Sequence, residues 1–126
     1  MEETFQPIRS FFNLDAWRES HSLVISVYIM TKLLPKEELF GLVSQMRRCA
    51  VSITSNIAEG FSRQSYKEKI QFYFMSLGSV TELQNQLFVT KDVGYINKEE
   101  FEKLYDQSIK VHKIINGLIK GAKKFA

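Results

Sequence analysis

The chain has little cysteine, proline or glycine and no long apolar run. Its 126 residues include one cysteine, two prolines and six glycines. A single cysteine excludes an internal disulfide, and low proline and glycine content argues against disorder. No apolar run approaches the roughly 18 residues that span a bilayer, and the N-terminus MEETFQPIRS lacks the apolar core of a signal peptide. We therefore expect a folded cytoplasmic protein without membrane contact, in which Cys49 packs in the core.

The sequence also lacks the motifs of common catalytic and cofactor sites. It has no Glu-x-x-His pair for a di-iron bundle and no glycine-rich phosphate loop. Its two histidines, His21 and His112, lie among apolar helical positions, which favours partly buried structural histidines over metal ligands. We expect a non-enzymatic protein without metal or cofactor. A small-molecule or metal pocket built from Ser52, Asn56, His21 or His112 is a third possibility.

Apolar residues repeat at helical spacing in four segments, and none shows the period-two alternation of a half-buried strand. The first predicted helix runs from about Asp15 to Leu34, with Asn13 or Asp15 as its cap and Pro35 ending it. It carries two adjacent apolar seams, Leu14, Trp17, His21, Val24 and Tyr28 in one, and Leu23, Val27, Met30 and Leu34 in the other. Such a broad stripe exceeds what one neighbouring helix can cover.

Capping residues, proline and glycine set the bounds of the other helices. The second is predicted over about residues 36–59, with Pro35 at its start and Gly60 as a left-handed terminating residue. Ser65 caps the third, which ends near residue 92 before Gly94, and Asn97 caps a fourth that reaches about residue 120. Because such short connections make neighbouring helices antiparallel, we predict an all-α, up-down-up-down four-helix bundle over residues 14–126.

Residues 1–13 are set apart as an N-terminal arm. Pro7 interrupts the segment, and Phe5, Ile8, Phe11 and Phe12 make it too apolar for a free tail. We expect the arm to pack against the bundle or a neighbouring subunit.

Polar residues gather on one side of the second predicted helix, at Gln45, Arg48, Ser52, Ser55, Asn56 and Glu59. A solvated face with helix-end capping is favoured over a ligand site. Glu59 is unfavourable near a helix C-terminus, so we expect a cationic partner, either Arg63 or an arginine of another chain. On the third helix, Phe72, Met75 and Leu83 lie away from the main seam and indicate a second buried contact. The candidates for an oligomer or polar helix face are Ser52, Asn56, Glu59, Phe72 and Met75.

The charge balance is mildly basic, with 17 basic and 14 acidic residues and a net charge of +3. The basic residues form three groups, which are Arg47 and Arg48; Arg63, Lys67 and Lys69; and Lys103, Lys110, Lys113, Lys120, Lys123 and Lys124. The last group forms a near-stripe that favours solubility over phosphate binding unless oligomerisation multiplies it. The candidate nucleic-acid-binding residues are Arg47, Arg48, Arg63 and Lys67.

Several local patterns together resemble a known family. They are Leu14, Trp17, Leu34-Pro35, Glu38, Phe40-Gly41-Leu42, Gln45-Met46-Arg47-Arg48, Ser52-Ile53, Ser55-Asn56-Ile57-Ala58-Glu59-Gly60, Gly78-Ser79 and Glu82-Leu83. In this order they resemble the 23S rRNA-intervening sequence protein family of four-helix-bundle proteins, encoded within intervening sequences of bacterial large-subunit rRNA genes or elsewhere in bacterial genomes. The likeness covers about residues 14–120. Thr54 replaces the usual proline of the family, which predicts a straighter helix there.

The resemblance implies a homopentameric ring, which would cover the excess apolar faces. The chain is more distantly similar to the accessory variability protein of diversity-generating retroelements, a basic pentamer implicated in binding nucleic acid and a reverse transcriptase. The leading hypothesis is an oligomeric bundle that binds structured, ribosomal RNA through arginine and lysine patches. The alternative is a protein-interaction scaffold, in which the arginines form intersubunit ion pairs with residues such as Glu59 and Glu82, and a partner protein docks on the ring.

Overall fold

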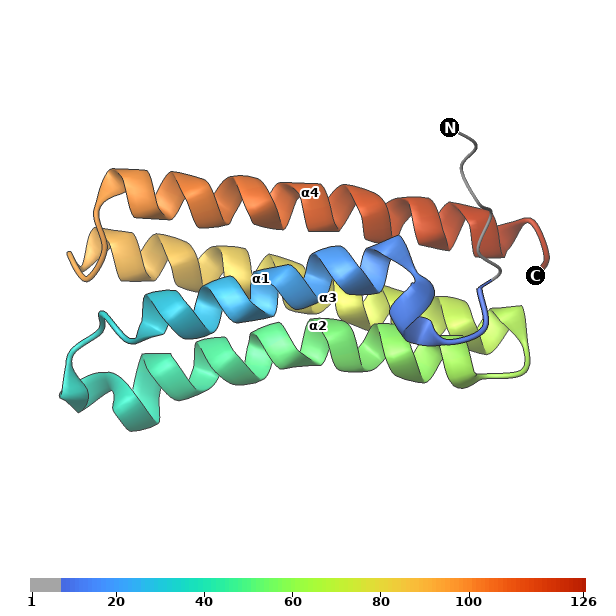
Figure 1. The fold of residues 1–126 in the computed structure, drawn as a ribbon, viewed down its shortest axis with the longest axis horizontal. Coiled ribbons are helices and arrows are strands. Elements are labelled where there is room, and N and C mark those ends of the chain that lie inside the picture. Colours follow the sequence, from blue (N-terminus) through green and yellow to red (C-terminus); the bar gives the residue numbers. More distant parts are fainter. Residues whose placement is uncertain (1–7) are drawn as a thin grey trace, which may run out of the picture.

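The structure, a computed structural model, describes residues 8–126, which contain four α-helices and no strand. The helices are α1 (Asp15–Thr31), α2 (Ser44–Ser62), α3 (Tyr66–Asp92) and α4 (Lys98–Lys123). Each runs antiparallel to the one before it (Figure 1). The largest interface joins α2 to α3, and α1 lies against both α2 and α4. The predicted all-α, up-down-up-down bundle is therefore confirmed.

One apolar stripe of each helix meets in a single core. Its fully buried members include Leu23 and Val27 of α1, Met46, Ile53 and Ile57 of α2, Val80, Leu83 and Leu87 of α3, and Ile115 of α4. The second predicted seam of α1 is buried throughout. The second buried contact predicted for Phe72, Met75 and Leu83 is wrong, because Leu83 lies in the single core and Met75 is 56% exposed. The other α1 seam is only partly buried, because His21 and Tyr28 are exposed. His21 instead stacks on Trp17, with ring centroids 4.6 Å apart.

Helix α1 begins where the sequence predicts but ends three residues earlier. The amides of Lys32, Leu33 and Leu34 donate to the carbonyls three residues back, so the chain tightens after Thr31. A proline disfavours the helical region for the residue before it, which accounts for the helix ending ahead of Pro35. The predicted cap is wrong. The Asn13 side chain accepts from the Ser10 amide at 3.2 Å, within the 3₁₀ turn Phe11–Asn13, and Leu14 precedes the helix without a side-chain cap.

The second predicted helix is broken near its start. A 3₁₀ turn, Lys36–Glu38, and a π-helical turn, Leu39–Val43, precede α2, and Gly41 has non-helical angles of φ −108° and ψ −110°. The Glu38 carboxylate accepts from the Leu42 amide at 3.2 Å and from the Tyr95 hydroxyl at 2.8 Å. An added Cβ at Gly41 would lie 2.8 Å from Glu38 Oε1. A tertiary contact with the α3–α4 loop therefore holds the break.

Gly60 has a different role from the one predicted. It lies inside α2, which continues to Ser62, and its φ is not positive. A Cβ on Gly60 would lie 2.7 Å from Tyr73 Cε1 and 3.0 Å from Phe72 Cβ. Glycine here permits the close approach of α2 to α3. Around Thr54, where the family usually has proline, α2 runs on without a non-helical residue.

The other helix ends match the sequence. The Ser65 hydroxyl accepts from the Glu68 amide at 3.1 Å, and the Asn97 side chain accepts from the Glu100 amide at 2.8 Å. Gly94 has φ 87°, the left-handed conformation predicted after α3. Of the predicted arm, Phe5 and Pro7 lie outside the described residues. Phe11 packs on Trp17, with ring centroids 5.4 Å apart.

Candidate nucleic-acid interface

The C-terminal half of α4 is the most basic segment of the chain. Residues 110–126 contain no aspartate or glutamate but carry five exposed lysines, Lys110, Lys113, Lys120, Lys123 and Lys124. Lys110 Nζ lies 3.3 Å from Glu19 Oε2, and none of the other four has an ion pair within residues 8–126. Lys120 and Lys123 lie in the last turn, where positive charge is favoured by the helix dipole. Four cations are therefore free to meet an anionic partner.

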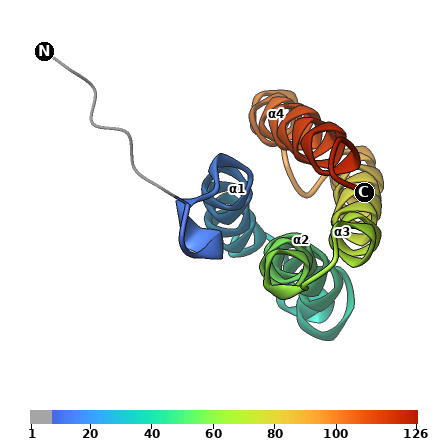
Figure 2. The same cartoon turned by 90° about the vertical axis from the view of Figure 1, so that its right-hand side faces the viewer.

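Aromatic rings bring the start of α3 against this end of α4. The ring centroids of Tyr66 and Phe125 are 5.1 Å apart, and Lys123 Nζ lies 5.5 Å from the Phe74 centroid. All three rings are exposed. Figure 2 faces this end of the bundle, where the C-terminus lies beside α3. We call it the basic aromatic end, and define it by Lys67, Lys120, Lys123, Lys124, Tyr66, Phe74 and Phe125.

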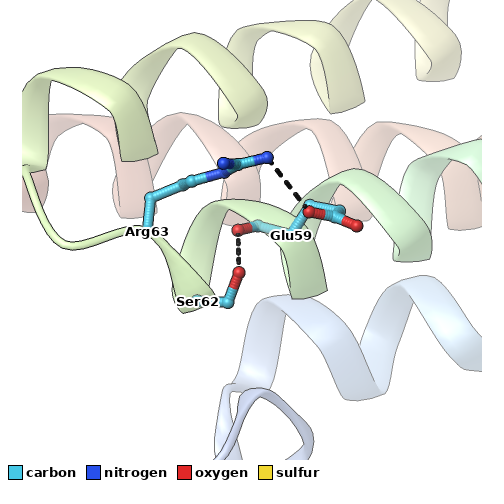
Figure 3. A network of polar contacts seen from close by, with 3 residues as sticks. All are labelled: Glu59, Ser62 and Arg63. Atoms are coloured by element: carbon cyan, nitrogen blue, oxygen red, sulfur yellow. Dashed lines mark hydrogen bonds and ion pairs between the residues drawn. The ribbon is translucent and has the colours of Figure 1, made fainter.

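Two of the predicted binding residues, Lys67 and Arg63, lie near this end, but only Arg63 is held in an ion pair. Lys67 is exposed and forms no ion pair in the described part of the chain. Arg63 Nη2 lies 3.4 Å from Glu59 Oε2, and its guanidinium carbon lies 4.6 Å from the Phe72 centroid (Figure 3). Glu59 therefore has the Arg63 partner that its position predicted, within one protomer. Ser62 Oγ adds a hydrogen bond to the Glu59 carbonyl at 2.7 Å.

Arg47 and Arg48 form a separate group. Fifteen residues of helix between Arg48 and Arg63 correspond to roughly 22 Å at the helical rise, so the four candidates do not make one cluster. Arg47 Nε donates to Thr31 Oγ1 at 2.9 Å, and its guanidinium carbon lies 4.7 Å from the Tyr28 centroid. Arg47 is thus engaged between α1 and α2. Arg48 is exposed and free to bind a partner.

The predicted polar face of α2 is mostly solvated, because Gln45, Arg48, Ser55 and Glu59 are exposed and only Ser52 bonds to α3. Ser52 Oγ and Ser79 Oγ are 2.9 Å apart, and Asn56 Nδ2 donates to the Ser52 carbonyl at 2.9 Å. Cys49 Sγ donates to the Ser79 carbonyl at 3.0 Å. Burial, with the nearby Glu82 carboxylate, raises the pKa of the Cys49 thiol to about 12. The thiol is therefore protonated at neutral pH, and Cys49 and Ser52 join α2 to α3.

A second exposed surface lies where α2 begins. A groove of about 670 Å³ is lined by Tyr28, Leu39, Phe40, Val43, Ser44, Arg47, Arg48, Val51, Ser52 and Ser55. Phe40 is 93% exposed beside the break at Gly41. Tyr28, Leu39 and Val51 are also exposed along the same groove, and a contiguous exposed apolar patch is typical of a protein contact. We call this surface the Phe40 groove.

The remaining candidates are dispersed. Met75 is exposed, whereas Phe72 is half-buried beneath Arg63. His112 Nδ1 lies 3.2 Å from Asn116 Nδ2 within α4. Over residues 8–126, no three histidine, cysteine or acidic side chains are placed to hold a metal ion. Among those residues no helix combines the length and apolarity needed to cross a membrane.

Comparison with known proteins decides the family. The sequence model of the family described as 23S rRNA-intervening sequence protein matches residues 12–117. The chain belongs to this family. No curated protein sequence matches the chain.

A solved structure shares its fold. It is a protein of unknown function from the S23 ribosomal protein family of Bacteroides thetaiotaomicron VPI-5482, with a TM-score of 0.77 at 24% sequence identity. The match covers 83% of this chain and 98% of the other. At that identity the likeness supports the four-helix architecture alone.

Sequence reasoning misses the aromatic part of the basic aromatic end. Neither Tyr66 nor Phe125 stands in a recognisable motif, so nothing local marks them as binding residues. The available signal is topological. Since α3 and α4 are antiparallel and of similar length, the first residue of one must lie beside the last residues of the other.

Proposed function

We propose that this family member is a non-enzymatic, cytoplasmic protein that binds structured RNA, with ribosomal RNA as the first candidate. The observation that carries the proposal is the acid-free lysine segment of α4 packed beside Tyr66 and Lys67 of α3. Unpaired lysines contact phosphates and release counterions, and exposed rings stack on unpaired bases. Of the four binding residues predicted from the sequence, Lys67 belongs to this site, whereas Arg48 supplies a second, distant contact.

A net charge of +3 is small for a nucleic-acid binder, so one copy should bind weakly. Association of several copies multiplies the sites and raises the avidity without new contacts. We therefore propose that RNA binding requires a homo-oligomer. The resemblance to known four-helix-bundle pentamers makes five the expected number of copies.

RNA binding is tested by fluorescence anisotropy with a labelled rRNA hairpin at two salt concentrations. The double variant Lys123→Ala, Lys124→Ala should weaken binding and lower the salt slope by about 0.7–0.9 for each phosphate that the protein no longer neutralises. The matched control is Lys98→Ala, Lys103→Ala, which removes two exposed charges from the other end of α4. Equal weakening in both variants, or no binding by the wild type, would refute the site.

Oligomerisation has its own support and test. Exposed apolar residues lie on α2 at Val51, just before it at Phe40, and on α3 at Met75 and Val89. Association with further copies would bury this apolar surface. Native mass spectrometry should show a single closed oligomer. Phe40→Ser, a change at a residue 93% exposed, should reduce its subunit number without unfolding the bundle. A wild-type protein that stays monomeric at micromolar concentration would contradict the proposal.

The second candidate function is a protein-interaction scaffold, and the Phe40 groove favours it. The groove combines an exposed apolar rim with the free guanidinium of Arg48, which suits an acidic, amphipathic partner segment. In this case Arg48→Ala should weaken assembly or partner binding and leave RNA affinity unchanged. The reverse outcome, weaker RNA affinity with assembly intact, would favour the RNA proposal.

A further inference from the structure

An apolar cavity opens at the basic aromatic end. Its volume is about 480 Å³, within the range of small-ligand sites. It is lined by Ile8, Leu14, Phe61, Tyr66, Lys69, Tyr73, Gly117, Leu118, Gly121, Ala122 and Phe125. All four helices or their flanking residues contribute, at the end of the bundle that faces the reader in Figure 2.

Two glycines of α4 keep the cavity open. Gly117 and Gly121 are one turn apart, and a Cβ built on either meets no atom within 4 Å. Glycine is the least favourable residue in a helix interior after proline. A larger residue at either position would therefore stabilise the helix, and the structure has room for its side chain. The cavity is retained against the local preference of the helix.

Tyr73 gives this space a polar group. The residue is only 3% exposed and lines the cavity, and its hydroxyl makes no hydrogen bond to another described side chain or carbonyl, although it is not one of the buried polar atoms left without a partner. Burial raises the pKa of Tyr73 to about 12, so the group is a neutral donor at physiological pH. The hydroxyl is therefore a donor on the cavity wall that a polar edge atom of an occupant can meet.

Cations and rings surround the opening. Lys69 Nζ donates to the Phe61 carbonyl at 2.6 Å and lies 5.8 Å from the Tyr66 centroid. Lys123 is exposed close by, over Phe74. The cavity thus combines flat aromatic walls, one hydrogen-bond donor inside and positive charge outside. An alkyl chain would offer the Tyr73 hydroxyl no acceptor, whereas a nucleotide supplies a planar ring, polar ring edges and a phosphate.

We propose that this cavity takes an unpaired nucleobase of the bound RNA, flipped out of a loop or end, with its phosphates on the surrounding lysines. The inference rests on the proposed RNA binding and deepens it. Proteins that read RNA commonly stack unpaired bases on aromatic side chains. The protein should therefore prefer looped or single-stranded RNA over a continuous duplex.

The test uses the full chain and an RNA hairpin that carries 2-aminopurine in its loop, with a blunt duplex as the second probe. Wild-type protein should quench the loop fluorophore, because stacking on a ring quenches it. Gly121→Leu fills the cavity and should abolish the quench and weaken hairpin binding at least about fivefold, the lower limit for removing one stacked base. Duplex affinity should not change.

Gly78→Leu is the matched control, because Gly78 is exposed on α3 and its Cβ also meets no atom within 4 Å. It should behave as the wild type. Tyr73→Phe, which removes only the hydroxyl, should weaken hairpin binding and leave the fold intact, as shown by circular dichroism.

The outcomes separate the two proposals. If hairpin and duplex bind with a steep salt dependence but the loop fluorophore stays bright, or if Gly121→Leu matches Gly78→Leu, the nucleobase cavity is wrong and RNA binding stands. A cavity already filled by an apolar molecule would give that same bright signal. If neither RNA binds, the proposed function falls and this inference with it.

Discussion

Gly60 gives the sharpest test of the packing between α2 and α3. Replacing it with alanine has two opposing effects. Alanine is favoured over glycine in a helix interior by about 1 kcal/mol. Its Cβ, however, would lie 2.7 Å from Tyr73 Cε1 and 3.0 Å from both Tyr73 Cδ1 and Phe72 Cβ, against roughly 3.5–4.0 Å for relaxed carbon contacts.

The steric effect should win. The Tyr73 ring is buried and cannot swing into solvent, and the Phe72 Cβ is fixed to the backbone of α3. Overpacking of this kind costs about 1–3 kcal/mol. After the gain in helix propensity, Gly60→Ala should lower the free energy of unfolding by up to about 2 kcal/mol, which corresponds to a fall in Tm of up to roughly 8 °C for a chain of this length.

Thermal and urea denaturation followed by circular dichroism measure the change, and Gly78→Ala is the control. Gly78 is exposed within α3 and its Cβ would meet nothing, so alanine there should raise stability by about 0.4–1 kcal/mol. The same substitution should therefore have opposite signs at two helical glycines. If Gly60→Ala stabilises the protein as much as Gly78→Ala does, the close approach of α2 and α3 is wrong.

Two further predictions concern single groups. Thr31→Val removes the oxygen that accepts from Arg47 Nε and should cost about 1–2 kcal/mol in urea denaturation, whereas Thr81→Val on the exposed face of α3 should change little. Burial raises the pKa of both Tyr73 and Cys49 to about 12, which is above their values in the unfolded chain. Their contribution to stability is therefore complete below about pH 8.5 and is lost as the pH rises toward 12, at up to about 1.4 kcal/mol per pH unit for each group. Tyr73→Phe should reduce the pH dependence of the free energy of unfolding above about pH 10. An unchanged urea midpoint from pH 8 to 11 in the wild type would contradict the burial of both groups.

The fold was predictable because its main signals are local. Ser65 and Asn97 cap their helices through residues three positions ahead, and Gly94 takes the left-handed conformation typical of a glycine after a helix. The prediction for Gly60 was wrong because a glycine can mark either a helix end or a close contact, and only the partner helix distinguishes the two. The break at Gly41 depends on Tyr95, which is 57 residues away from Glu38. No local pattern encodes such a contact.

The candidate site was harder to predict than the fold. The four candidate binding residues all carry a positive charge, but their surroundings differ. They are Arg47, Arg48, Arg63 and Lys67. Arg47 is held by Thr31 and Arg63 by its own helix, so free cations remain at Arg48 and Lys67. Charge is readable from a sequence, whereas the availability of a charge depends on which neighbours the fold supplies.

The buried thiol of Cys49 has a practical consequence. Because alkylating reagents attack thiolates, a thiol that is protonated and bonded to the Ser79 carbonyl should be inert while α2 and α3 stay together. Maleimide would then modify only molecules in which these two helices have separated. The rate of maleimide labelling in native buffer therefore measures how often α2 and α3 separate locally, without the need to introduce a cysteine.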